Sequence, residues 1–156
     1  MKYKLVAEGT AYRLVALKDF AGVLSGDLGG LVEGEHNLSQ EGSCWIFREA
    51  KVSGKAQVFG EAKVSAGAWV SGEARVYGGA KVAGKAWVFG AAEVSEKARV
   101  FGDARVFGKA RVFGKAEVSG RAKVFGEARV FGEALVSIKA EVSGKAEVFG
   151  KVEVSG

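Results

Sequence analysis

The feature that most constrains this chain is a six-residue repeat, A-x-V-[S/F]-G-x, which runs from residue 50 to residue 156. Alanine holds the first position in 17 consecutive hexads, from Ala50 to Ala146, and valine holds the third in 18, from Val52 to Val154. Glycine holds the fifth position in 15 hexads, and Ala66, Glu96 and Ile138 replace it in the other three. Self-similarity at a fixed short period indicates a solenoid.

The spacing within the hexad is typical of a short β-strand followed by a corner. Alanine and valine lie two positions apart, so both side chains point to one side of a strand, and the residues before and after valine point to the other. A glycine without a Cβ then allows the backbone to turn. Three such units close a triangular coil of 18 residues. We therefore expect alanine and valine inside the coil and the post-valine residues, many of them phenylalanine, outside.

The repeat resembles the hexapeptide repeat of left-handed parallel β-helices, in which an aliphatic residue is followed by a small residue four positions later. Val52 with Ala56 and Val58 with Ala62 show this spacing. The left hand is implied by the resemblance. The expected fold class is all-β, a single-stranded left-handed parallel β-helix with a triangular cross-section and a small N-terminal β cap.

Residues 1–43 lack the repeat and are expected to form that N-terminal β cap. Residues 3–7 and 12–17 have the composition of two strands joined through a turn at residues 8–10. A cap covers the unpaired N–H and C=O groups that the first coil otherwise presents. Cys44, Trp45 and Ile46 occupy the first three positions of an earlier hexad, so the β-helix is predicted to span residues 44–156. No matching cap follows the last hexad, which favours stacking of that end onto another chain.

The segments 16–20, 26–33 and 37–46 resemble the N-terminal segment of one bacterial and phage family. Members of that family combine this segment with a hexapeptide β-helix and are described as acyltransferase-like, without an established activity. The resemblance covers nearly the whole chain, and it implies a phage or prophage context.

Little in the chain favours catalysis. Acyltransferases of this fold use a histidine base, whereas the only histidine here, His36, precedes the coils, and no loop interrupts the hexads after Ala50. His36 with Glu33, Glu35 and Asn37 has no recognised ligand spacing, so neither a metal nor another cofactor is expected. The sequence thus predicts a protein that is not an enzyme, with an acyltransferase-like enzyme as the alternative.

Composition restricts the partners and the location. The net charge is +5, and the 23 basic and 18 acidic residues are interspersed, which argues against a dedicated nucleic-acid surface. No apolar stretch is long enough to cross a membrane, and the only apolar run near the N-terminus, residues 5–7, is too short for a secretory signal. Cys44 is the only cysteine, which fits a reducing compartment. We expect the cytoplasm of the host cell, or the virion if the protein is phage-derived.

The informative variation is at the post-valine position, where residues 18 apart should stack. The first side carries Phe89, Phe107 and Phe125; the second carries Phe59, Tyr77, Phe113, Phe131 and Phe149, interrupted by Ser95; the third carries mainly Ser65, Ala83, Ser119, Ser137 and Ser155, with Phe101 as the exception. Trp69 and Trp87 lie on the first side, before valine. Aromatic rows of this length predict a contact surface, most simply between copies of this chain. The alternative is that ring stacking stabilises the coil by itself.

Two further features leave other binding functions open. Trp69 and Trp87 could form a platform for a sugar or a base. Lys63, Lys81 and Arg99 form a row on the third side, with Lys85 near it, that could follow phosphates. Acidic Asp103, Glu117 and Glu153 end this row, which favours an ordinary solvated face. The sequence hypothesis is therefore a non-catalytic, self-associating β-solenoid with a structural or protein-interaction role, and a binder of glycan or nucleic acid is a second alternative.

Overall fold

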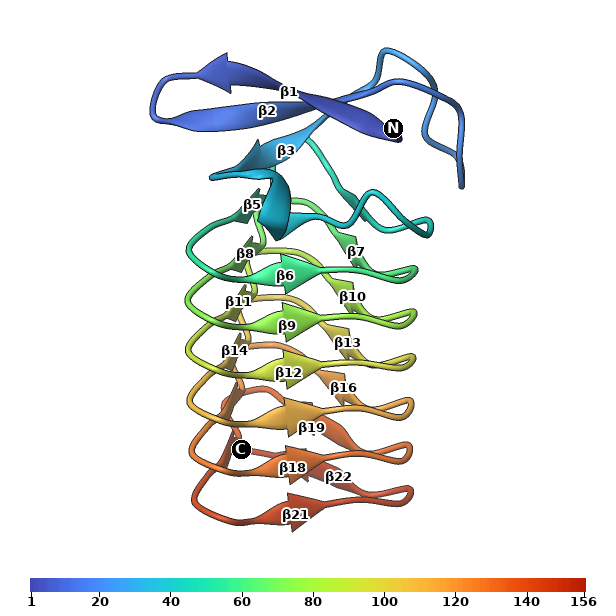
Figure 1. The fold of residues 1–156 in the computed structure, drawn as a ribbon. Coiled ribbons are helices and arrows are strands. Elements are labelled where there is room, and N and C mark those ends of the chain that lie inside the picture. The colour runs from blue at the N-terminus through green and yellow to red at the C-terminus, as the bar shows by residue number, and fades with distance from the viewer.

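The structure, a computed structural model that describes residues 1–156, is a three-sided β-solenoid with an N-terminal cap at one end (Figure 1). Three parallel sheets run along the rod, and successive strands within each sheet are 18 residues apart. The only helical segment is a 3₁₀ turn, η1 (Glu35–Asn37). The predicted all-β architecture is confirmed.

We name the three sides by their sheets. Face 1 consists of β5 (Lys51–Val52), β8 (Trp69–Val70), β11 (Trp87–Val88), β14 (Arg105–Val106), β17 (Lys123–Val124) and β20 (Glu141–Val142). Face 2 consists of β6 (Gln57–Val58), β9 (Arg75–Val76), β12 (Glu93–Val94), β15 (Arg111–Val112), β18 (Arg129–Val130) and β21 (Glu147–Val148). Face 3 consists of β4 (Trp45–Ile46), β7 (Lys63–Val64), β10 (Lys81–Val82), β13 (Arg99–Val100), β16 (Glu117–Val118), β19 (Leu135–Ser137) and β22 (Glu153–Ser155).

The interior contains the alanine and valine columns that the repeat predicts. All alanines of the repeat from Ala50 to Ala140, and all its valines from Val52 to Val142, are buried. Val148 and Val154 in the last coil are only partly buried, because no further coil covers them from below. The core is thus a narrow apolar column, in which each coil packs only against its two neighbours.

Backbone hydrogen bonds hold adjacent coils in register at the strands and at the corners. The Arg105 N–H donates to the Ala122 carbonyl at 2.9 Å, and the Phe107 N–H donates to the Val124 carbonyl at 2.9 Å. At the corner, the Lys109 N–H donates to the Gly126 carbonyl at 2.7 Å. Because the corners are bonded as well as the strands, the backbone of each residue lies directly over that of the residue 18 positions away.

The corners require a left-handed backbone. Gly108, for example, has φ of 69°, and a Cβ there would lie 3.0 Å from the backbone N of Gly126. The three hexads that lack glycine adopt the same conformation: Ala66, Glu96 and Ile138 have φ of 53°, 59° and 59°. These three residues bear the steric cost of a conformation that L-residues disfavour, so the corner geometry is imposed by the stacked coils.

The cap begins with an antiparallel hairpin of β1 (Tyr3–Glu8) and β2 (Ala11–Ala16), close to where the sequence predicts two strands. A third strand, β3 (Leu28–Val32), pairs antiparallel with β2 and parallel with β5, so it joins the hairpin to face 1. In Figure 1 the hairpin lies across the end of the rod and β3 lies beneath it.

The first coil of the solenoid is built from residues outside the repeat. Val32 pairs with Val52, Leu38 forms a bridge with Val58, and Ile46 pairs with Val64, so each face receives one more rung above the hexads. Val32, Leu38 and Ile46 are buried like the valines beneath them. The end of the repeat is thereby covered by a coil in which only the segment from Cys44 onward follows the hexad pattern.

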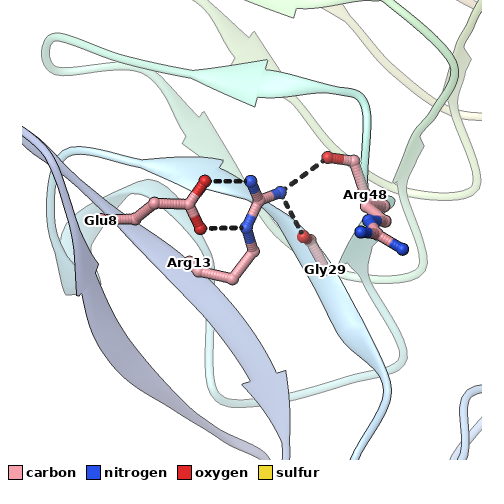
Figure 2. A network of polar contacts seen from close by, with 4 residues as sticks. All are labelled: Glu8, Arg13, Gly29 and Arg48. Atoms are coloured by element: carbon pink, nitrogen blue, oxygen red, sulfur yellow. Dashed lines mark hydrogen bonds and ion pairs between the residues drawn. The ribbon is translucent and has the colours of Figure 1, made fainter.

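Arg13 fastens the hairpin to the first coil (Figure 2). Its Nε donates to Glu8 Oε2 at 2.7 Å, and its Nη2 pairs with Glu8 Oε1. Its Nη1 donates to the carbonyls of Gly29 at 3.1 Å and Arg48 at 2.9 Å. The hydrogen bonds from Arg13 lower the pKa of Glu8, and those to Glu8 raise the pKa of Arg13. One guanidinium group therefore connects β2, β3 and the corner after β4.

Two buried residues of the cap region were not expected from the sequence. Lys2 is buried, and its Nζ donates to the Cys44 carbonyl at 3.0 Å and contacts Cys44 Sγ at 3.2 Å. Trp45, at a position that points outward in later hexads, is also buried, because Tyr3 and Phe20 pack edge-on against it at centroid distances of 6.4 and 5.4 Å. The cap thus covers the outer side of the first hexad as well as its end.

Candidate interaction surface

The post-valine side chains form columns on the outside of the rod. None of the ten aromatic residues predicted as an interface belongs to the buried core. Because coils rise by about 4.8 Å, rings on adjacent coils stack nearly parallel, as for Phe107 and Phe125, with centroids 5.0 Å apart and planes at 3°. Stacking shields most of these rings, and only Trp69 (42%) and Phe149 (57%) are strongly exposed in the single chain. The columns are therefore less exposed than the sequence suggested.

Face 1 carries an unbroken column of five rings, which we call the face 1 column. Its members, in order along the rod, are Trp69, Trp87, Phe89, Phe107 and Phe125, with consecutive centroid distances of 5.0, 4.3, 4.8 and 5.0 Å. The two tryptophans enter the column from the pre-valine position. Their indole N–H groups donate to the hydroxyls of Ser53 at 2.9 Å and Ser71 at 3.0 Å. The indoles therefore lean over the post-valine serines and take the place of the missing rings.

Face 2 carries two shorter stacks. Phe59 and Tyr77 stack at 4.9 Å, and Phe113, Phe131 and Phe149 stack at 4.9 and 5.2 Å. The buried Ser95 separates the two stacks, as the sequence predicts. At this break the Tyr77 hydroxyl donates to Glu93 Oε2 at 3.1 Å.

The environments of the two faces differ in charge. On face 2, guanidinium groups lie over the rings: Arg75 is 5.4 Å from the Phe59 centroid and 5.5 Å from that of Tyr77, and Arg129 is 5.5 Å from that of Phe131. On face 3, Arg99 lies 5.4 Å from the Phe101 centroid. No cation lies over any ring of the face 1 column. Face 1 is thus the aromatic surface with the least charge over its rings.

About half of the outward charges of the repeat are paired between coils. Eight ion pairs join residues 18 apart: Lys55–Glu73, Arg75–Glu93, Arg99–Glu117, Arg111–Glu93, Lys115–Glu133, Lys123–Glu141, Arg129–Glu147 and Lys151–Glu133. These pairs are exposed and contribute little individually. Where they occur, these pairs place opposite charges on adjacent coils, which is a structural role.

His36 and Trp87 are the residues that the sequence offers for catalysis, metal binding or sugar binding. His36 lies in η1, exposed, and its Nε2 is 2.8 Å from the Gly54 carbonyl, so this contact orients the ring toward the backbone of the next coil. The structure contains no group of three His, Cys, Asp or Glu residues that could hold a metal ion. Trp87, considered as part of a sugar platform, is covered on both faces by Trp69 and Phe89.

Two features of this surface escaped the sequence analysis. The first is the orientation of the two indoles, which brings the tryptophans into line with the phenylalanines. This orientation depends on side-chain rotamers and on the Ser53 and Ser71 hydroxyls, which the repeat pattern does not specify. The second is Phe47, a post-valine residue of the first coil on face 3. Its signal was its position after Cys44, Trp45 and Ile46 in the earlier hexad.

The chain matches no protein-family model and no curated protein. The structure contains no helix that is long and apolar enough to cross a membrane.

Proposed function

We propose that this protein is a non-catalytic, self-associating rod in which the face 1 column forms the contact between copies. The observation that supports this proposal most directly is the continuity of that column: five stacked rings follow one another along the rod with no cation over them. Apolar rings with no cation over them suit a lasting, dry contact. The face 2 rings, with arginines over them, suit such a contact less well.

A structural role follows from the rigidity of the rod. Every coil is bonded to its neighbours at strands and corners, so a pair of rods joined along face 1 would be stiff over the whole repeat. The phage or prophage context, and with it the host cytoplasm or the virion, rests on the resemblance of the N-terminal segment and is part of the proposal. Face 1 could instead contact a different protein, and a solution experiment must separate this alternative from self-association.

The test is solution mass measured by sedimentation velocity across a concentration series. The wild-type chain is expected to form a dimer or larger species, and the double variant Phe107→Ser, Phe125→Ser is expected to sediment as a monomer. The matched control is Phe113→Ser, Phe131→Ser, which removes two stacked rings from face 2 and should retain the wild-type mass. Circular dichroism and the melting temperature establish that both variants keep the fold.

Three outcomes would contradict the proposal. A wild-type chain that remains monomeric at all concentrations excludes self-association. An unchanged mass for the face 1 variant points to another contact, such as end-to-end stacking on the last coil, which these substitutions leave intact. Dissociation of the face 2 variant alone would move the interface to face 2.

A further inference from the structure

Face 3 contains a gap in its post-valine column that the other faces do not match. Phe47, Ser65, Ala83 and Phe101 follow one another on adjacent coils, since their strands pair in register. On faces 1 and 2, rings on adjacent coils lie 4.8 to 5.2 Å apart. Here two consecutive positions carry small side chains between two phenylalanines. The gap therefore has the length of two missing rings.

The gap is a groove of about 260 Å³. Phe47 and Phe101 line its ends, and Ser65 and Ala83 lie between them. Lys63, Lys81 and Arg99, from the pre-valine positions of the same three coils, complete the lining with Val100. The groove thus combines the space of stacked rings with a row of three cations along one edge.

The charges along this edge are unusual for the rod. In the strand register Lys63 lies beside Lys81, and Lys81 lies beside Arg99, so three cations occupy adjacent strands. Like charges in this position are destabilising. Arg99 is compensated by Glu117, with Nη1 to Oε1 at 3.1 Å. Lys63 and Lys81 form no ion pair. The other faces have at most two cations in a row: Arg111 and Arg129 on face 2 each contact a glutamate, and on face 1 Lys123, beside the unpaired Arg105, contacts Glu141.

The extent of the positive edge limits the size of a ligand. Beyond Arg99 the row continues with Glu117, and beyond Lys63 it ends at the buried Trp45. Three coils of positive charge are too short for an extended polyanion, whose binding depends on many phosphate contacts. The volume is also below that of typical sites for drug-sized molecules. The dimensions fit one small planar molecule.

We propose that this groove binds a small aromatic anion: a planar ring system that stacks on Phe101 at the level of Ala83, in one of the two vacant positions of the column, with a phosphate or comparable group held by Lys63 and Lys81. Base stacking on aromatic side chains and charge-assisted hydrogen bonds from lysine are the two interactions that such a ligand would use. A nucleoside monophosphate is the simplest member of this class. This site lies on a different face from the proposed self-association contact and does not depend on it.

The experiment is isothermal titration of the full chain with adenosine 5′-monophosphate, compared with adenosine and with ribose 5-phosphate. We expect saturable binding of one nucleotide per chain, and binding of each fragment weaker by about tenfold or more, because each lacks one of the two interactions. Ala83→Phe should abolish binding, since it places a ring in the gap while all cations remain. Lys81→Gln should weaken nucleotide binding by about tenfold, whereas the control Lys109→Gln, an exposed corner lysine with no ion pair, should leave it unchanged.

Each of several results would overturn the proposal. One is the absence of saturable nucleotide binding at millimolar concentration. Another is nucleotide binding that Ala83→Phe leaves intact, because the ligand would then be held by surface charge alone. A third is tighter, strongly salt-dependent binding of a single-stranded oligonucleotide that Ala83→Phe does not affect. A change in sedimentation mass for Ala83→Phe would show instead that a second chain occupies the groove.

Discussion

The corner conformation leads to a prediction in which removing a side chain stabilises the protein. Ile138 occupies a corner with φ of 59° and a side chain that is 57% exposed. A left-handed backbone costs an L-residue about 1–2 kcal/mol. Replacing Ile138 with glycine removes that cost. The extra conformational freedom of glycine in the unfolded chain lowers the free energy of unfolding by about 0.5–1 kcal/mol. Because the side chain is exposed, little burial is lost. The net expectation for Ile138→Gly is a gain of about 0.5–1 kcal/mol in the free energy of unfolding.

The matched control is Gly120, which lies on the preceding coil directly over Ile138. Gly120 has φ of 62°, and a Cβ there would lie 2.8 Å from the Ile138 backbone N. Gly120→Ala therefore adds the left-handed cost and a contact with backbone that cannot move without disturbing the stack. We expect this substitution to lower the free energy of unfolding by about 1–2 kcal/mol or more.

Both effects are measurable as melting temperatures by scanning calorimetry. For a chain of this length, 1 kcal/mol corresponds to about 2–4 °C. Ile138→Gly should raise the melting temperature by about 1–4 °C, and Gly120→Ala should lower it by at least about 2 °C. If Ile138→Gly is neutral or lowers the melting temperature, the corner does not impose a left-handed conformation, and the account of the hexad's fifth position is refuted.

Three further predictions concern the core and the cap. Val106→Ala removes two carbons from a fully buried site and should cost about 2–3 kcal/mol in chemical denaturation; a cost below about 1 kcal/mol would contradict a packed interior. Burial raises the pKa of Tyr3 to about 12. The stability that the neutral phenol contributes is complete below its ordinary pKa near 10 and is lost as the pH rises from 10 to 12. Tyr3→Phe should reduce this alkaline loss of stability, and an unchanged pH profile would refute the prediction. Arg13→Gln should speed hydrogen exchange in β1 and β2. Because Arg13 lowers the pKa of Glu8, the wild-type chain should lose some stability as the pH falls through that pKa, and the variant should not show this loss. Unchanged exchange would mean that this guanidinium does not hold the hairpin.

The interior could be predicted because it follows from local sequence. Ala104 and Val106 are inside for the same reason as every other pair in the repeat, namely two-residue strand periodicity with a corner every six residues. The outward direction of Phe107 and the break at Ser95 follow from the same rule. Repetition makes each of these inferences independent of distant contacts.

The cap could not be predicted as completely, because its contacts join residues far apart in the chain. Lys2 is buried against Cys44, 42 residues away, and Trp45 is buried only because Tyr3 and Phe20 cover it. No pattern in residues 28–46 indicates that Val32 extends the valine column. These residues are placed by packing against the coil beneath them, and their own sequence does not specify it.

The continuity of the face 1 column depends on chain length between its members as well as on their identity. Because a coil is three hexads, removing one hexad between Phe89 and Phe107 would turn everything downstream by one face, and Phe107 would leave the line of Phe89. Removing three hexads would restore the line and shorten the rod by one coil. Natural variation in length among proteins of this kind is therefore expected to occur in steps of 18 residues wherever the aligned surface is needed, and single-hexad changes are expected only where it is not.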